Sequence, residues 1–136
     1  MSIKEIQEEI IEEFAFFDDW MEKYEHIIDL GKSLPLIKEE LKTEDRLIKG
    51  CQSRVWLHSE LKEDKIVFYA DSDAIITKGL IALMVRVLSE QKPEDIVNAD
   101  LYFIDKINLK EHLSPTRSNG LLSMVKKMKM DALVRK

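Results

Sequence analysis

The chain has 136 residues, of which 45% are hydrophobic and 35% are charged, as is typical of a soluble globular protein. Its net charge of −5 argues against a free nucleic-acid-binding protein, which usually carries a clustered basic face. Residues 1–45 hold fourteen acidic and five basic side chains, which form either solvated helix faces or a surface that steers a basic partner. We expect one domain over residues 1–136.

No segment of the sequence predicts export or membrane insertion. The first 17 residues are rich in glutamate and lack the basic and apolar regions of a secretory signal. No stretch reaches the roughly 18 apolar residues of a membrane span. The only cysteine, Cys51, cannot form an internal disulfide. We therefore expect a cytoplasmic protein in a reducing compartment, with no membrane partner.

Two amphipathic helices are expected at the N-terminus. Ser2, followed three residues later by Glu5, predicts a capping box, and apolar residues then recur at helical spacing to about residue 17. A second helix is expected from Asp18 or Asp19 to Gly31, a residue that commonly follows the end of a helix.

The hydrophobic period changes to that of strands in the middle of the chain. Three segments rich in β-branched and aromatic residues are expected as strands: Leu47–Lys49, Ser53–Glu60 and Lys65–Ala70. Their short connections exclude parallel crossovers and predict an antiparallel arrangement. The expected fold class is therefore α+β, a small three-stranded antiparallel sheet packed against several helices.

The remainder of the sequence predicts helices. One of them runs from a cap at Ser72 or Asp73 to about Gln91 and is apolar on most sides, so it should be the central buried helix. Gly79 inside it predicts the close approach of another element, because glycine otherwise costs a helix about 1 kcal/mol. Two further helices are expected at Pro93 and after Ser114-Pro115.

Cys51 is the candidate for chemistry because it follows Gly50 in the short break between two predicted strands. Lys49 and Arg54 are close in sequence, and positive charge lowers the pKa of a thiol and raises its thiolate fraction. This pattern alone is also compatible with a small buried hydrophobic residue, the more common role of a lone cysteine.

The sequence around Cys51 resembles a known family. The string GCQSRVWL at Gly50–Leu57 is similar to the cysteine-loop signature of the SufE family of sulfur acceptors. Three further segments resemble the family's pattern in the same order along the chain: Trp20–Pro35, Ala70–Leu80 and His112–Leu121. The four segments together span about residues 20–125.

The resemblance implies both a fold and an activity. The implied fold is similar to that of IscU-type scaffolds. The implied function is to take persulfide sulfur on Cys51 from a pyridoxal-phosphate-dependent cysteine desulfurase of the SufS or CsdA type, and to stimulate that enzyme. The sulfur then passes to a SufBCD-like scaffold for iron–sulfur cluster assembly. On this interpretation the protein is an accessory of transpersulfuration, without a cofactor or metal of its own, rather than a stand-alone enzyme.

Four residues are candidates to support Cys51. Gln52 and Ser53 either donate hydrogen bonds to a sulfur anion or complete the turn. Arg117 is the candidate cation beside the thiolate, with a salt bridge to Asp73 as its alternative role. Asp73 itself is expected as a helix cap rather than a chemical group.

Two alternatives of other classes use the same cysteine. A metal-cluster scaffold needs several soft ligands, and one cysteine cannot fill such a site. A cysteine hydrolase would pair Cys51 with a histidine, and the chain offers His26, His58 and His112. Along a strand, His58 would lie ~20 Å from the thiol.

A third alternative is a non-catalytic regulator that binds the desulfurase without carrying sulfur. Val55 and Trp56 would then form a docking surface beside the cysteine, although their β-propensity favours the interior of a strand. Replacing Cys51 by serine separates the two functions, because a regulator would still stimulate the desulfurase.

Overall fold

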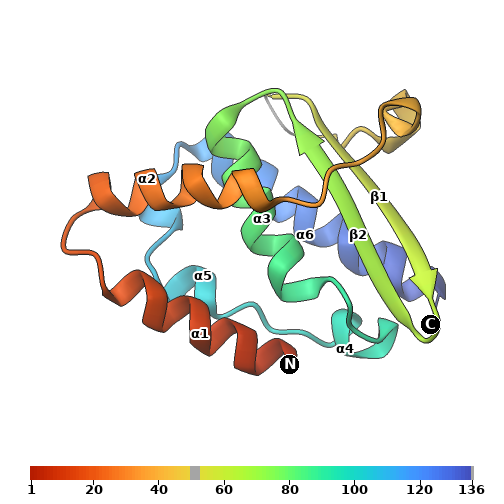
Figure 1. Cartoon of the computed structure of the whole chain (residues 1–136), viewed down its shortest axis with the longest axis horizontal. Helices are drawn as coiled ribbons and strands as arrows, with labels where there is room; N and C mark the ends of the chain where they lie inside the picture. Colours follow the sequence, from red (N-terminus) through yellow and green to blue (C-terminus); the bar gives the residue numbers. More distant parts are fainter. Residues whose placement is uncertain (50–52, 136) are drawn as a thin grey trace.

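Six helices and one β-hairpin make up the described part of the chain, and the hairpin lies along one side of the helices (Figure 1). The computed structural model describes residues 1–49 and 53–135. The helices within these residues are α1 (Ile3–Ala15), α2 (Trp20–Leu30), α3 (Ile75–Leu88), α4 (Pro93–Val97), α5 (Phe103–Lys106) and α6 (Pro115–Arg135). The strands are β1 (Val55–Lys62) and β2 (Lys65–Ser72), and short 3-10 turns connect several of the elements.

Side-chain caps fix the start of both N-terminal helices, as the sequence predicts. The Glu5 amide donates to Ser2 Oγ at 3.1 Å, and the Ser2 amide donates to Glu5 Oε1 at 3.0 Å, so the capping box is complete. Asp19 begins α2 by accepting a hydrogen bond from the Glu22 amide at 2.9 Å. Each cap satisfies amides that the first helical turn leaves without a partner.

The β-hairpin joins two of the predicted strands in the antiparallel arrangement that their short connection predicts. Val55 pairs with Ser72 at one end of the ladder, and Lys62 pairs with Lys65 at the turn. Glu63 in the turn has a φ of +59°, the left-handed conformation that tight hairpin turns require. Alternate residues of both strands are buried, so one face of the hairpin packs against the helices.

The expected third strand at Leu47–Lys49 is wrong, because the described sheet has two strands. Leu47 forms a single antiparallel bridge to Trp56, and the chain turns at Lys49 before a second bridge can form. Single bridges also lie along the other edge of the hairpin, from Leu36 to Ala70 and from Gln91 to Ile66. The edges are thus covered by short contacts rather than by a full strand.

The central helix α3 is buried on most sides and packs closely against α2. A Cβ added at Gly79 would lie 2.1 Å from the backbone oxygen of Ile27, a distance that no side chain tolerates. A Cβ added at Gly31 would lie 3.1 Å from the amide nitrogen of Gly79. The close approach that Gly79 predicts is therefore confirmed, and its partner is the last turn of α2.

The central helix ends at Leu88, three residues earlier than predicted. Ser89 has an extended backbone, and Glu90 has a φ of +62°. The Glu90 amide then donates to the Ile66 oxygen at 2.7 Å, and the Ile66 amide donates to the Gln91 oxygen at 2.9 Å. The chain leaves the helix here because these hydrogen bonds join it to the edge of β2.

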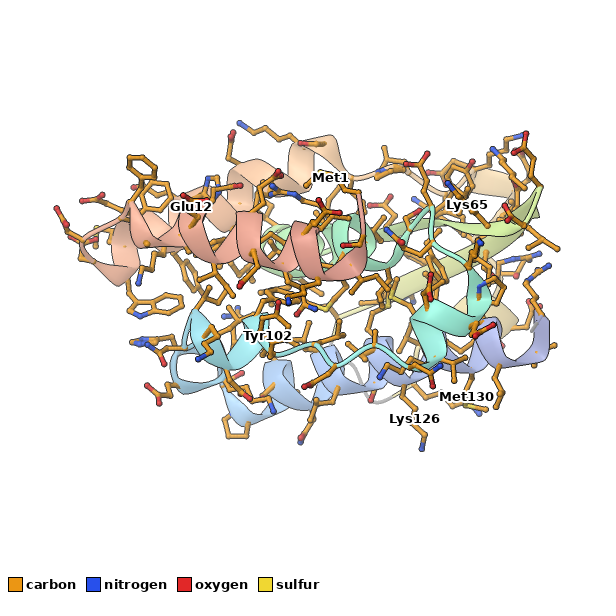
Figure 2. All side chains as sticks on the ribbon, turned by 90° about the horizontal axis from the view of Figure 1, so that it is seen from below. Met1, Glu12, Lys65, Tyr102, Lys126 and Met130 are labelled. Carbon is orange, nitrogen blue, oxygen red and sulfur yellow. The ribbon has the colours of Figure 1, made fainter. Side chains whose placement is uncertain are left out.

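The long helix α6 lies on the opposite side of α3 from α1 and α2. Figure 2 shows α1 in the upper half of the view and α6 along the bottom. Leu121, Met124 and Met128 of α6 are buried, as predicted, and Val125 is half-buried. Among the described helices, none combines the length and apolar character needed to cross a bilayer.

Candidate functional site

The predicted site is described here through the residues on either side of Cys51. Gly50, Cys51 and Gln52 lie outside the described residues, so the predictions made for Cys51 and Gln52 stay predictions. The flanking residues Ile48 and Lys49 on one side, and Ser53 to Val55 on the other, are described. We call residues 47–49 and 53–56 the stem of the cysteine segment.

The two sides of the stem are joined by backbone contacts. The Ile48 amide donates to the Val55 oxygen at 2.8 Å, next to the bridge between Leu47 and Trp56. Ile48 is 8% exposed and Val55 is 1% exposed, so both are anchored in the core. Because the chain enters and leaves at neighbouring points of the core, Cys51 belongs to a short connection whose ends are fixed.

Asp73 forms a second hydrogen-bonded connection at the base of the stem. Its Oδ1 accepts a hydrogen bond from the Arg54 amide at 3.1 Å, and its own amide donates to the Arg54 oxygen at 3.3 Å. The prediction that Asp73 caps a helix is wrong, because α3 begins after Ala74 and has no side-chain cap. The carboxylate instead accepts the hydrogen bond of the Arg54 amide, one residue beyond the Val55–Ser72 pair that ends the strand ladder.

A cavity of about 80 Å³ lies beside the stem, between α3 and α6. Its apolar wall is formed by Val55, by Leu80 and Ile81 of α3, and by Leu121 and Met124 of α6. Polar lining is added by four further residues: Ser53, Thr77, Thr116 and Arg117. Two of the predicted supporting residues, Ser53 and Arg117, are therefore brought to one cavity although they lie far apart in the sequence.

Arg117 has a different partner from the one considered in the sequence. Its Nη1 donates to Tyr24 Oη at 2.6 Å, which links the first turn of α6 to α2. Within the described residues it forms no ion pair with Asp73. The Arg117 amide also donates to Ser114 Oγ at 3.3 Å, the capping interaction of this helix start. Tyr24 was missed as a site residue, although it lies in the first of the matching segments.

A group of charges lies on the outer side of the hairpin near the stem. Lys42 Nζ is 2.7 Å from Asp71 Oδ2, and Lys78 Nζ is 3.3 Å from Asp71 Oδ1. Burial works to raise the pKa of the Asp71 carboxyl, but hydrogen bonds from Lys42 and the Ser72 amide, with the charge of Lys78, hold that pKa below its ordinary value. No sequence pattern near Lys42 predicted this group.

Trp56 is half-buried in the same group. Lys42 Nζ lies 5.2 Å from the centre of its ring, within the range of a cation–π contact. Asp71 is paired directly with Trp56 across the hairpin. Val55, the neighbour of Trp56, is buried. The two residues that the regulator alternative uses as a docking surface are thus one core residue and one residue covered by a lysine.

The three histidines all contact other side chains. Arg46 Nε donates to His58 Nδ1 at 3.2 Å, and His58 Nε2 is 3.2 Å from Glu60. His26 Nε2 is 2.5 Å from Glu13, and His112 stacks on Trp20 with ring centres 3.9 Å apart. Within residues 1–49 and 53–135, no group of three or more His, Cys, Asp and Glu side chains could hold a metal ion.

Curated relatives match the chain over most of its length. An uncharacterized SufE-like protein of Rhizobium etli is 41% identical over 133 residues, covering 94% of this chain and 90% of that protein. An uncharacterized SufE-like protein of Rhizobium meliloti is 38% identical over 130 residues, covering 92% of this chain and 93% of that protein.

A solved structure and a family model also match. The solution structure of a hypothetical protein from Thermus thermophilus covers 95% of this chain and 94% of its own, with a TM-score of 0.78 and 17% identity, which indicates the same fold. The SufE family model, described as an Fe-S metabolism associated domain, matches residues 8–132. With its four matching segments and its cysteine stem, the chain therefore belongs to the SufE family, whose domain is associated with iron–sulfur metabolism.

Proposed function

We propose that the protein carries sulfur as a persulfide on Cys51. The sulfur comes from a pyridoxal-phosphate-dependent cysteine desulfurase of the SufS or CsdA type and goes to a SufBCD-like scaffold in a reducing cytoplasm. The observation that carries the proposal is the stem, because the chain's only cysteine lies between two positions, Ile48 and Val55, that are hydrogen-bonded to each other. Membership of the SufE family supports the choice of iron–sulfur metabolism.

The proposed reaction is an exchange between two sulfur–sulfur bonds. The Cys51 thiolate attacks the outer sulfur of the desulfurase persulfide, and a new bond forms between the Cys51 sulfur and this outer sulfur. The bond inside the donor persulfide breaks, and its electron pair leaves on the donor cysteine as a thiolate. No net oxidation or reduction occurs, so the step needs no cofactor on this chain.

The described residues suit a carrier because they hold the two ends of the segment that contains Cys51. The stem holds its two ends through Ile48–Val55 and Arg54–Asp73. The cavity between α3 and α6 offers an apolar space beside the stem that could shelter a persulfide from water and from other thiols.

The supporting residues take more specific roles under this proposal. Asp73 is a positioning residue, since its carboxylate holds the Arg54 amide. Ser53 and Arg117 face the cavity and supply a hydroxyl and a guanidinium to a sulfur anion held there. Gln52 lies outside the described residues, and its role as a further donor rests on the sequence alone.

A desulfurase assay separates a sulfur carrier from a regulator. Alanine release by the desulfurase is measured with cysteine as substrate, alone, with the wild-type protein and with Cys51→Ser. We expect the wild-type protein to raise the rate and Cys51→Ser to leave it at the level of the enzyme alone, because serine cannot remove the outer sulfur. Equal stimulation by a folded Cys51→Ser protein would contradict the carrier function and establish the regulator.

A further inference from the structure

A second hollow lies beside residues 47–49 of the stem, whereas the cavity lies beside Ser53 and Val55. It has a volume of about 380 Å³ and is open to solvent between residues 45–49 and the outer side of α6. We call it the α6 groove, and it is lined mainly by Leu47, Ile48, Lys49, Lys126, Lys127 and Met130. Figure 2 shows Lys126 and Met130 on the side of α6 that faces away from α1.

The charge of the α6 groove is positive although the chain as a whole is acidic. Three lysines line it, with Asp45 as the one acidic residue in the lining. Lys127 is paired with Asp131 at 2.8 Å. Among the residues that the structure describes, Lys49 and Lys126 are exposed and form no ion pair. The groove therefore presents two ammonium groups without a carboxylate partner.

Apolar surface continues from the groove along α6. Met130 is 52% exposed and Leu133 is 57% exposed, both large fractions for such side chains. These residues line a neighbouring hollow of about 370 Å³, which shares Lys126 and Met130 with the α6 groove. Exposed apolar side chains rimmed by charges of one sign are typical of a protein-binding surface.

We propose that the α6 groove binds an acidic amphipathic segment of the protein that donates sulfur to Cys51. The segment would place carboxylates against Lys126 and Lys49 and an apolar side chain against Met130 and Leu47. This inference rests on the proposed function and adds the surface through which the donor is recognised. The stem then borders the cavity through Ser53 and Val55 and the docking surface through residues 47–49.

The position of the groove selects the donor as its occupant. Ile48 and Lys49 belong to both the groove and the stem, so a partner seated there comes close to the cysteine segment. The donor has to recognise the protein before a persulfide has formed on Cys51. A sulfur acceptor has to recognise the protein only after the persulfide has formed.

A charge reversal in α6 tests this surface without touching the stem. The dissociation constant of the donor desulfurase is measured by titration calorimetry with the wild-type protein, Lys126→Glu and Lys126→Glu/Met130→Ser. We expect about fivefold weaker binding for Lys126→Glu and about twentyfold for the double variant, with the effect of the charge shrinking as salt rises. The control is Lys4→Glu, an equal charge change on α1, across the molecule from α6.

Mass spectrometry at saturating desulfurase keeps this proposal separate from the proposed function. We expect Lys126→Glu to gain one sulfur on Cys51 as the wild-type protein does, because the chemistry is intact once the complex is filled. If the wild-type protein gains no sulfur, the proposed function fails. If it gains sulfur while Lys126→Glu binds the donor as tightly as the wild type, only the docking surface is refuted.

Two other results would assign the groove to a different occupant and overturn the proposal. Sedimentation could show a wild-type dimer that Lys126→Glu dissociates, which would make the groove a contact between copies of this chain. Alternatively, Lys126→Glu could leave donor binding unchanged and slow sulfur release to a scaffold, which would make the groove a site for the acceptor.

Discussion

The central helix α3 packs against its neighbours in different ways on its two sides. On the side of α2, the backbone of Gly79 lies so close to Ile27 that no Cβ fits between the helices. On the side of α6, a cavity of about 80 Å³ remains, and its wall includes Leu80 and Ile81 of the same helix. One side is closed by steric contact of backbones, whereas the other retains free space.

The free space on the α6 side of α3 therefore lies beside the stem, whose two parts flank Cys51 in the sequence. The tight α2 contact fixes α3, and α3 in turn forms one wall of the cavity next to Ser53 and Val55. The stem is held by the hydrogen bond of Asp73 to the Arg54 amide, and Asp71, which pairs with Trp56 of the stem across the hairpin, is held by Lys42 and Lys78. We infer that the α2 side provides rigidity and that the stem side is built from contacts that can be changed without unfolding the protein.

Gly79→Ala should lower the stability of the protein more than any of the substitutions that follow, because it alters the side of α3 where the helix backbones are in direct contact. The added methyl group would meet the Ile27 oxygen, and the helices would have to move apart. We expect the free energy of unfolding to fall by about 3 kcal/mol, measured by urea denaturation.

Gly31→Ala is the matched control for that change. Its added methyl group would meet the Gly79 amide nitrogen at 3.1 Å, a contact that a small shift relieves. We expect a loss of about 1 kcal/mol. Equal stability of Gly79→Ala and the wild type would show that the α2 side is not the rigid one.

Asp71→Asn should have the next largest effect on stability. Its effect should depend on pH, because the variant removes a charge that stabilises the stem side. Folding lowers the pKa of the Asp71 carboxyl, so its ionised form stabilises the folded state above the ordinary pKa of 3.8. That contribution is lost as the pH falls through the lower folded pKa. We expect Asp71→Asn to cost about 2 kcal/mol at pH 7 and progressively less below pH ~4.

Thermal or urea unfolding at several pH values measures this difference. Glu40→Gln serves as a control, because Glu40 is an exposed carboxylate elsewhere on the surface. A loss for Asp71→Asn that stays constant from pH 7 down to pH 2 would mean that the charge of Asp71 does not stabilise the stem side.

Asp73→Ala should loosen the stem and leave the α2 side unchanged. The Arg54 amide loses the carboxylate that accepts its hydrogen bond, a contact worth about 1 kcal/mol at an exposed position. We expect the Arg54 amide to exchange its hydrogen about fivefold faster, while amides of α2 keep their rates. Asp73→Asn is the control, since its side-chain oxygen can still accept this bond. Faster exchange in both regions would contradict their independence.

Tyr24→Phe should have the smallest effect of these changes. It removes the hydroxyl that accepts from Arg117 Nη1, in a pair exposed to solvent. We expect a loss of about 0.5 kcal/mol or less in unfolding free energy, measured by urea denaturation. A loss above about 2 kcal/mol would place this pair in the rigid part of the molecule rather than at the rim of the cavity.

Local patterns were sufficient to predict much of the fold. The capping box at Ser2, the hairpin between β1 and β2 and the close approach at Gly79 each depend on residues near one another in the sequence or on one residue's geometry. The third strand failed because the β-propensity of Leu47 and Ile48 does not reveal that the chain turns after one bridge.

The site was harder to predict because its contacts are distant in sequence. Aspartate is a common helix cap. Only the folded structure shows that the Asp73 carboxylate accepts a hydrogen bond from the Arg54 backbone amide, nineteen residues away. The pair of Tyr24 and Arg117 spans 93 residues. The cavity arises where β1, α3 and α6 meet, and no single segment encodes it.

The most direct test of the central claim is the intact mass of the protein after incubation with desulfurase and cysteine. We predict a gain of about 32 Da, one sulfur atom, that a thiol reductant removes and that Cys51→Ser does not acquire. An unchanged wild-type mass under conditions in which the desulfurase itself carries a persulfide would contradict the proposal that this chain carries sulfur on Cys51.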